Sequence, residues 1–260
     1  MKKRKIIMGI LCAILAIIVV LAIAVAVIAG GNVRAMDHCV EAVLEELRKD
    51  HTVTAVDPGE YKEMTIYGIM KFHVEQYDIE NVGNLSVMRV NMGVMQMATV
   101  VITPQDKNLP LLSADYMYIL NNRKSYLEFY DVVAEKDDQY MQLLTDLGNV
   151  QKNFDHLNDI ETTPAWYADL LTVTSYKGGD SKADAELERM LVDSLRVYLD
   201  HGKSFPLLSE EARAEKIGIT VEYTDGLIEK GGISTDVFKK ELGTEETKKF
   251  FDQVFFGTAV

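Results

Sequence analysis

The stretch from Met95 to Val133 constrains the fold of this chain most, because it reads as three successive β-strands. Side chains in each run change sides at every position, which is the period of a strand with one face buried. Pro104 ends the first run, and Asn121 with Asn122 suits the tight turn after the second. The predicted strands of this antiparallel meander are residues 97–102, 114–120 and 126–133.

The regions on both sides of the meander complete the predicted secondary structure. Residues 67–79 and 86–91 read as two more strands, which gives a sheet of about five or more antiparallel strands. Beyond the meander, apolar residues recur at helical spacing, and Gly178 with Gly179 is interpreted as a loop. The predicted helices are residues 137–150, 183–201, 209–230, 235–242 and 244–256. Strands followed by helices indicate an α+β fold in which helices pack on an antiparallel sheet.

The N-terminus has the order of charge and hydrophobicity that a membrane anchor requires. The basic residues Lys2 to Lys5 precede the uncharged run Ile6 to Gly31, which is long enough to span a lipid bilayer. A secretory signal peptide has a shorter apolar region of about 7 to 15 residues, so the run favours a retained signal anchor. Because basic residues stay on the cytoplasmic side, we predict a single-pass protein whose N-terminus is cytoplasmic and whose domain lies on the outer face.

An amphipathic helix over residues 37–49 follows the anchor and is expected to act as a spacer. The predicted division is a cytoplasmic tip and membrane anchor at 1–34, a linker helix at 35–62 and a sandwich domain at 63–260. Five of the 27 basic residues lie before residue 35, which leaves 22 basic against 40 acidic residues and a net charge of −18. Such a surface disfavours nucleic acid and anionic lipid headgroups as partners.

The sequence carries none of the common cofactor motifs. It has no glycine-rich phosphate loop, no GxGxxG after a strand and no His pair at helical spacing, so no flavin, nicotinamide or metal site is predicted. Cys12 lies in the apolar run and Cys39 stands alone in the domain, which predicts no intrachain disulfide. No lipid attachment is expected at Cys12, because Leu11 occupies the position where a lipoprotein signal needs a small residue.

The chain has 12 methionines, and four of them lie in one hairpin region: Met88, Met92, Met95 and Met97. Ordinary filling of the core is the first interpretation of this group. A second is an adaptable pocket for a large, flat, apolar ligand, because thioether side chains are flexible and polarisable. A Cu(I) site is the third, since soft sulfur ligands suit that ion.

One aspartate departs from the local pattern of the meander. Period-two geometry places Asp115 on the same sheet face as Met117 and Ile119, whereas Tyr116 and Tyr118 lie on the other face. Burial raises the pKa of a carboxyl group unless a cation or several N–H groups hold it, and such a group can donate a proton near neutral pH. Alternatively, Asp115 caps a turn at the start of its strand, and the local sequence leaves both interpretations open.

Two segments of the chain resemble one protein family. The first is a strand that ends in Thr103-Pro104 and leads into the segment NLPLLSAD, residues 108–115. The second is the C-terminus, in which residues 238–256 form two predicted helices with Gly243 at the break and the segment VFF near the end. Both segments are similar to those of the ferredoxin-dependent bilin reductases.

This resemblance implies a three-layer α/β/α sandwich with a central antiparallel sheet, here preceded by one N-terminal transmembrane helix. It also implies a linear tetrapyrrole between the sheet and the C-terminal helices, with Met97, Met117 and Tyr223 as the expected ligand contacts. Asp115 falls on the family's aspartate, which protonates the bilin during electron transfer from ferredoxin. The resemblance thus implies that a partner protein donates the electrons and that the domain itself holds no redox cofactor.

The chain departs from the family in its other proton-handling groups. The family's histidine falls near Ala98 and its second aspartate near Gly231 and Gly232, so both groups are missing. An acidic ferredoxin is also an unfavourable partner for an acidic, outward-facing domain. Only a local patch of basic residues would favour its docking, and the candidates are Arg123, Lys124, Lys239, Lys240, Lys248 and Lys249. Two hypotheses follow: a tetrapyrrole reductase with Asp115 as proton donor, and a non-catalytic, membrane-tethered binding module that kept the scaffold.

Overall fold

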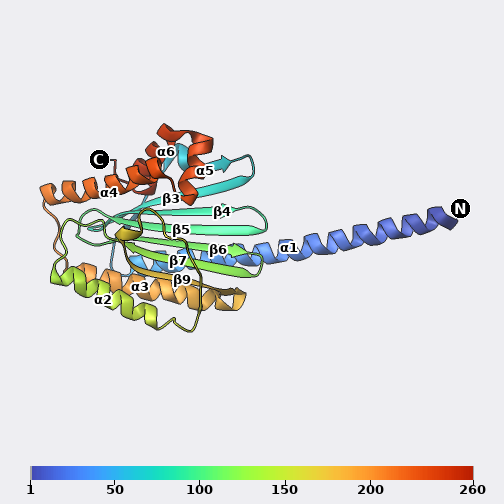
Figure 1. Ribbon diagram of the computed structural model, residues 1–260, viewed down its shortest axis with the longest axis horizontal. Coiled ribbons are helices and arrows are strands. Elements are labelled where there is room, and N and C mark those ends of the chain that lie inside the picture. Colours follow the sequence, from blue (N-terminus) through green and yellow to red (C-terminus); the bar gives the residue numbers. More distant parts are fainter. Residues whose placement is uncertain (1, 260) are drawn as a thin grey trace.

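The computed structural model describes residues 2–259, with the side chains of residues 2–7, 9, 233 and 234 outside the description. A central antiparallel sheet lies between two helical layers (Figure 1), which confirms the predicted α+β, three-layer sandwich. The strands follow the order β1-β3-β4-β5-β6-β7-β9-β8 across the sheet, and β2 also pairs with β3. The strands are β1 Val53–Val56, β2 Glu63–Ile66, β3 Met70–Ile79, β4 Gly83–Asn91, β5 Met95–Pro104, β6 Leu111–Ile119, β7 Asn122–Tyr130, β8 Asn158–Asp159 and β9 Leu171–Asp180.

The helices lie mainly after the meander, as predicted. They are α1 Lys2–Arg48, α2 Asp138–Lys152, α3 Asp184–Ser204, α4 Glu210–Lys230, α5 Ile233–Leu242 and α6 Thr244–Phe250, with a π-helical turn at Phe251–Phe255. Short 3₁₀ turns occupy Gly59–Tyr61, Ala168–Leu170 and Ser181–Ala183. The hydroxyl of Ser209 accepts a hydrogen bond from the Ala212 N–H at 3.2 Å and so caps α4. At the other end of α4, Gly231 has a φ of 83°, which favours glycine.

The structure corrects the predicted loop at Gly178 and Gly179. Both residues belong to β9, which pairs with β7 along its whole length and leaves only the short β8 beyond it. The β-branched residues Thr172, Val173 and Thr174 are the local signal for this strand. Pairing with β7 satisfies the backbone groups of β9, and this outweighs the weak strand preference of glycine.

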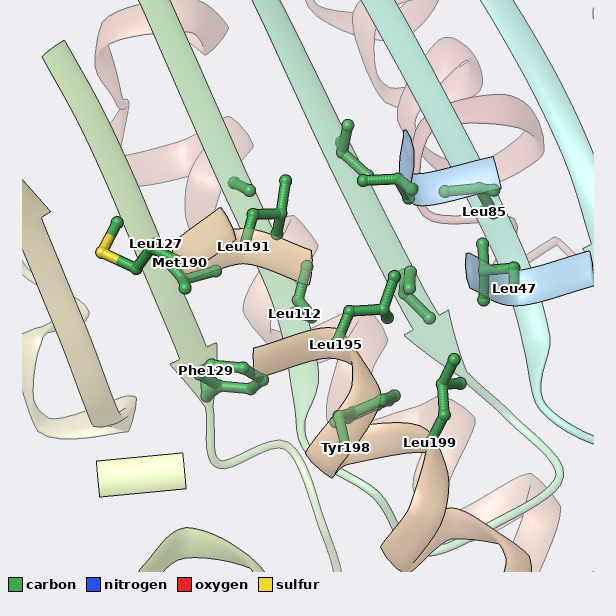
Figure 2. Packing of buried hydrophobic residues seen from close by; sticks show 14 of the residues in the cluster. Leu47, Leu85, Leu112, Leu127, Phe129, Met190, Leu191, Leu195, Tyr198 and Leu199 are labelled. Carbon is green, nitrogen blue, oxygen red and sulfur yellow. The ribbon is translucent and has the colours of Figure 1, made fainter. Parts of the chain in front are cut away.

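The sheet face that carries Tyr116 packs against α1, α2 and α3. Apolar residues of α3 recur on one side of the helix and point at the sheet, so their burial removes a continuous apolar surface from water (Figure 2). The residues labelled in this view are Leu47, Leu85, Leu112, Leu127, Phe129, Met190, Leu191, Leu195, Tyr198 and Leu199.

The opposite sheet face packs against the C-terminal helices α4, α5 and α6. Aromatic rings dominate this second cluster. The ring centroid of Phe238 lies 5.1 Å from that of Phe72 on β3 and 5.2 Å from that of Phe250 on α6. Tilted rings at this spacing stabilise one another beyond their burial. The predicted closing pair of helices therefore holds the second layer on the sheet.

The helix α1 is longer than predicted and serves two parts of the molecule. By length and composition it is apolar enough to cross a membrane, and its apolar side chains between Ile10 and Val27 are largely exposed. Its C-terminal part is packed in the core instead. The buried residues there are Met36, Cys39, Val40, Val43, Leu44 and Leu47.

This packing overturns the spacer expected at residues 37–49. That segment is a core helix on the Tyr116 face, and it anchors the first helical layer to the sheet. Strands β1 and β2 pair with β3, so most of the segment 35–62 belongs to the sandwich. The boundary placed at residue 63 thus separates β1 from the sheet to which it belongs, because short strands next to Pro58 and Gly59 gave no clear periodic signal.

Candidate functional site

Strand β6 places Asp115 on the face of the C-terminal helices and the two tyrosines on the other. Tyr116 and Tyr118 are buried against α1 and α3, with 3% and 4% of their surface exposed. Asp115 and its neighbours toward the β7–β9 side are only partly buried, because the C-terminal helices pack mainly over the first strands of the sheet. We call this region the open sheet face and define it by Met97, Asp115, Met117, Tyr126 and Tyr176.

The carboxyl of Asp115 has one direct side-chain partner. Thr99 lies opposite it on β5, is 4% exposed, and donates a hydrogen bond from its hydroxyl to the carboxyl. Burial raises the pKa of Asp115 to about 6, the Thr99 hydrogen bond opposes that rise, and the negative charge of Glu128 adds to it. Asp115 is therefore a group that can change its protonation state near neutral pH, and it is not the cap of a turn.

Glu128 on β7 organises the tyrosines beside Asp115. It accepts hydrogen bonds from the hydroxyl of Tyr130 at 2.5 Å and from that of Tyr176 at 2.8 Å. Tyr126, directly opposite Asp115 on β7, is also opposite Tyr176 on β9, and their ring centroids are 5.7 Å apart. The missed strand β9 thus brings an aromatic side chain to the edge of the open sheet face.

A tyrosine cluster made of Tyr130, Tyr167 and Tyr223 closes one end of the open sheet face. The ring of Tyr223 in α4 lies 5.1 Å from that of Tyr130 and 5.9 Å from that of Tyr167. Burial raises the pKa of Tyr223, and the negative charges of Glu128 and Asp115 add to the rise. Tyr223 thus connects α4 to the side of the sheet that carries Asp115 and Glu128.

Trp166 fixes the loop that carries Tyr167. Its indole N–H donates to the Gly231 carbonyl at 2.9 Å. Its ring lies so close to Gly226 in α4 that a Cβ there would be 2.4 Å from a ring carbon. Only glycine permits this approach, so α4 is shaped to receive the indole.

The two methionines predicted as ligand contacts lie side by side. Met97 on β5 is opposite Met117 on β6, two residues along the strands from Thr99 and Asp115, and both side chains are partly buried. Met88, in contrast, is 1% exposed and fills the second core cluster. Met117 lies where the helical cover of the sheet is incomplete.

The structure also locates the positions at which the chain departs from the bilin reductases. Ala98 is 1% exposed and points to the α1–α3 side, so the residue beside Asp115 on β5 is Thr99. Gly231 and Gly232 precede α5, and the carboxylate of Asp236 lies so close to Gly231 that a Cβ there would be 2.9 Å from one of its oxygens. The side-chain partner of Asp115 is therefore the hydroxyl of Thr99.

Several of the predicted basic residues are already engaged. Arg123 pairs with Asp184 at 2.5 Å, and Lys248 pairs with Asp225 and with Asp252. Lys249 contacts Glu60 at 3.1 Å and Glu246 at 3.4 Å. Lys239 donates to the Ile228 carbonyl. The ion pairs of Arg123, Lys248 and Lys249 neutralise much of the positive charge that an acidic protein partner would need.

A cavity of about 240 Å³ lies elsewhere, between α1, the β6–β7 turn and the start of α3. Its charged groups pair with one another: His38 contacts Glu188 at 2.5 Å, and Arg123 contacts Asp184. Pockets for small ligands usually measure about 300–1,000 Å³. Among the residues that the structure describes, no group of three or more His, Cys, Asp or Glu could hold a metal ion. A second, open hollow of about 900 Å³ lies between the β6–β7 turn, β8 and the end of β9. We take the open sheet face as the candidate site because it carries Asp115 and the tyrosines that hydrogen-bond to Glu128.

The sequence predicted Asp115, Met97, Met117 and Tyr223 as site residues, and the structure places all four on the side of the sheet that carries the C-terminal helices, with Tyr223 in α4. It missed Glu128, Tyr126, Tyr130, Tyr167 and Tyr176. The alternation of Tyr126, Glu128 and Tyr130 along β7 was the available signal, because it places three hydrogen-bonding side chains on the face of Asp115. Nothing local could have revealed Tyr167, which lies in an irregular segment.

No family model matches the chain, and no curated protein matches its sequence. Its structure is similar to the crystal structure of phytochromobilin synthase from tomato in complex with biliverdin. The TM-score is 0.68 at 12% sequence identity, and the match covers 85% of this chain and 83% of that chain. The chain therefore has a bilin-reductase-like fold, which agrees with the resemblance of the two sequence segments.

Proposed function

We propose that the domain binds a linear tetrapyrrole-type ligand against the open sheet face, with Asp115 beside the ring nitrogens. The observation that carries this proposal is a carboxyl group with a pKa raised to about 6, on a partly buried sheet face that is bordered by tyrosines. A tetrapyrrole is large, flat, mostly apolar and lined with N–H groups. The similar tomato enzyme was solved with such a molecule, biliverdin.

The side chains at the open sheet face suit the chemistry of such a ligand. The thioethers of Met97 and Met117 adapt to a flat apolar surface, and the rings of Tyr126 and Tyr176 can stack on it. Asp115 can accept a hydrogen bond from a pyrrole N–H as the carboxylate, or donate one as the acid. A few polar groups on an otherwise apolar surface are the usual pattern of a small-molecule site.

Reduction of the bound ligand is a second candidate function. It is favoured by the pKa of Asp115, because a general acid works best when its pKa lies near the operating pH. The electrons would come from an external donor of the ferredoxin type. Two observations disfavour this activity. The partner of Asp115 is Thr99 and not a second proton-handling group, and several basic residues that could attract ferredoxin are already paired with carboxylates. We therefore place ligand binding first and expect no turnover with reduced ferredoxin.

The test of binding is a titration of the purified full chain, in detergent micelles, with biliverdin and with heme. Absorption spectra should show saturable binding of biliverdin. Met117→Gln should weaken it about 10-fold, because one lost apolar contact is worth about 1–2 kcal/mol. Met141→Gln is the matched control, since Met141 on α2 is 50% exposed and lies on the other side of the sheet. Equal affinities in the two variants would place any ligand elsewhere.

Catalysis needs a separate measurement. Biliverdin would be incubated with the full chain, a reduced ferredoxin and its reducing system, and the loss of biliverdin absorbance followed. Turnover by the wild type that is lost in Asp115→Asn would establish reduction and Asp115 as its proton donor. Binding without turnover supports the binding module.

A further inference from the structure

Three hairpin turns of the sheet lie at one end and expose apolar side chains. The turns join β2 to β3, β4 to β5 and β6 to β7. Their tips carry Tyr67, Ile69, Val94 and Leu120, which are 41%, 73%, 51% and 42% exposed. We call these four residues the hairpin tips. Large apolar side chains gathered at one end of a domain mark a contact surface.

The hairpin tips lie at the end of the sheet from which α1 leaves the domain (Figure 1). The side-chain amide of Asn32 in α1 donates a hydrogen bond to the Leu120 carbonyl at 3.0 Å. Asn32 directly follows the apolar run from Ile6 to Gly31, which is the part of α1 that can cross a bilayer. The last residue of that run is thus level with a hairpin tip.

The link between α1 and the sheet is rigid. The helix runs without interruption into its core segment, where Met36 is 3% exposed and Val40 and Leu47 are fully buried. Because the helix is continuous, the orientation of the sheet is fixed relative to the apolar part of α1. The hairpin tips must therefore face the surface of any membrane that α1 spans.

The composition of the two ends of the sheet differs. The tip segments Ile66 to Met70, Asn91 to Met95 and Ile119 to Lys124 contain no acidic residue, in a chain with 40 of them. At the opposite end, the β3–β4 turn contains Glu80 and the β5–β6 turn contains Asp106. The three tip segments themselves thus carry no carboxylate, whose burial at a lipid interface would be costly. Two carboxylates lie beside the β6–β7 tip: Asp180 is opposite Asn122, and Asp184 is paired with Arg123.

Two of the hairpin tips adopt a backbone conformation that their side chains disfavour. Tyr67 and Leu120 both have a φ of 52°. For residues other than glycine this conformation costs roughly 1–2 kcal/mol, and asparagine or glycine would fill such turns at lower cost. A bulky apolar residue at a strained and exposed position indicates a role for its side chain outside the domain. The ammonium of Lys240 lies 5.5 Å from the Tyr67 ring centroid and can extend toward lipid headgroups.

We infer that the hairpin tips insert into the interface of the bilayer that α1 spans, so that the sheet stands on the membrane at a fixed orientation. The inference rests on α1 spanning the membrane and is independent of any ligand. The contact is apolar, because the domain as a whole carries a net charge of −18 and gains nothing from anionic headgroups. Tyrosine and aliphatic side chains are suited to this zone.

The test uses the full chain in vesicles of phosphatidylcholine, with a fluorophore on single cysteines and a nitroxide quencher on the lipid near the headgroup. Ile69→Cys and Val94→Cys place the fluorophore on the hairpin tips. Glu80→Cys and Glu135→Cys place it on exposed positions at the far end of the sheet. All four variants also carry Cys12→Ser, and Cys39 is buried.

We expect the lipid-borne nitroxide to quench the fluorophore at residues 69 and 94 and to leave it unquenched at 80 and 135. Equal fluorescence at both ends of the sheet would overturn the inference. A control chain with the fluorophore on the native Cys12, and a nitroxide deep in the acyl chains, reports whether α1 is inserted. If Cys12 is not quenched, the anchor itself has failed and the inference falls with it. Quenching at Cys12 with none at the tips refutes the contact alone.

Discussion

Thr99 and Asp115 form a cross-strand pair in which the Thr99 hydroxyl donates a hydrogen bond to the Asp115 carboxyl. This bond holds the carboxyl in place on a sheet face that is otherwise apolar and aromatic. It also opposes the rise in the pKa of Asp115 that burial causes. The pair thus decides how readily Asp115 takes up a proton near neutral pH.

Removal of the hydroxyl should make Asp115 harder to ionise. In Thr99→Val we expect the pKa of Asp115 to rise above about 6, because the ionised form loses its side-chain donor. At pH 8 the variant should lose about 1–3 kcal/mol of stability. The pKa is measured by carbon-13 NMR of the Asp115 carboxyl, and Thr99→Ser, which keeps the donor, should restore the wild-type value. An unchanged pKa in Thr99→Val would show that the hydrogen bond does not stabilise the carboxylate.

The stability of Asp115→Asn should depend on pH in a defined direction. The pKa of Asp115 is about 6 in the folded state and 3.8 as the reference for the unfolded state, so the folded state holds its proton more tightly. As pH rises from 3.8 through about 6, the wild type loses stability relative to the variant. Above that range Asp115→Asn should be more stable by at most ~3 kcal/mol.

Thermal unfolding of both proteins at pH 4 and at pH 8 measures this difference. The advantage of Asp115→Asn should be largest at pH 8 and small at pH 4. Asp78→Asn supplies the control, since it makes the same substitution at an exposed position of β3. An advantage of Asp115→Asn that grew as pH fell would contradict the direction of the pKa shift.

The core role of α1 predicts a large effect at Leu47. It is fully buried against the sheet, so Leu47→Ala should cost about 2–5 kcal/mol through lost burial and the cavity it leaves. Leu15→Ala lies in the apolar run at a position that is 62% exposed, and should change domain stability by about 0.5 kcal/mol or less. Urea unfolding in detergent micelles compares the two. A small effect of Leu47→Ala would contradict the core role of α1 and support a spacer at residues 37–49.

Lys216 should give a second pH-dependent contribution. Its ammonium is buried and donates to the carbonyls of Leu109 at 2.8 Å and Val132 at 3.1 Å. Burial lowers its pKa to about 7 from 10.5, so the unfolded state holds the proton more tightly between these values. The stability of the wild type should therefore rise, relative to Lys216→Met, as pH increases from about 7 to 10.5.

The methionine variant has its own cost, because it leaves the two carbonyls without their donor. We expect Lys216→Met to lose about 1–3 kcal/mol at pH 7, measured by urea unfolding. Lys62→Met replaces an exposed lysine and should show neither the loss nor the pH dependence. A stability difference that stays constant between pH 7 and pH 10 would show that Lys216 keeps its proton in the folded state.

Local sequence was sufficient for the elements that repeat a clear period. The strands of the meander and the amphipathic helices α2, α3 and α4 could be predicted because burial of one face requires periods of 2 and 3.6 residues. Continuity of α1 could not be predicted from the sequence. Gly30 and Gly31 lower helix propensity, but packing of the segment that follows outweighs this cost.

Residues of the candidate site could be predicted only where the residue type departed from the apolar pattern around it. Asp115 was visible because a charge interrupts an apolar face. Thr99 and Glu128 looked like ordinary polar residues of a strand, since Asp115, the partner of Thr99, and Tyr176, one partner of Glu128, come from neighbouring strands whose register the sequence does not show. Tyr176 became part of the site only through the pairing of β9 with β7.

The absorption spectrum of bound biliverdin, titrated with acid in the wild type and in Asp115→Asn, tests the central claim most directly. A carboxyl beside the ring nitrogens should give the wild-type complex a spectral transition on acidification that Asp115→Asn lacks. The affinity for biliverdin should stay nearly unchanged, because the amide keeps the shape of the site. If biliverdin does not bind, or if the two proteins show the same transition, Asp115 does not contact a tetrapyrrole and the proposed function is wrong.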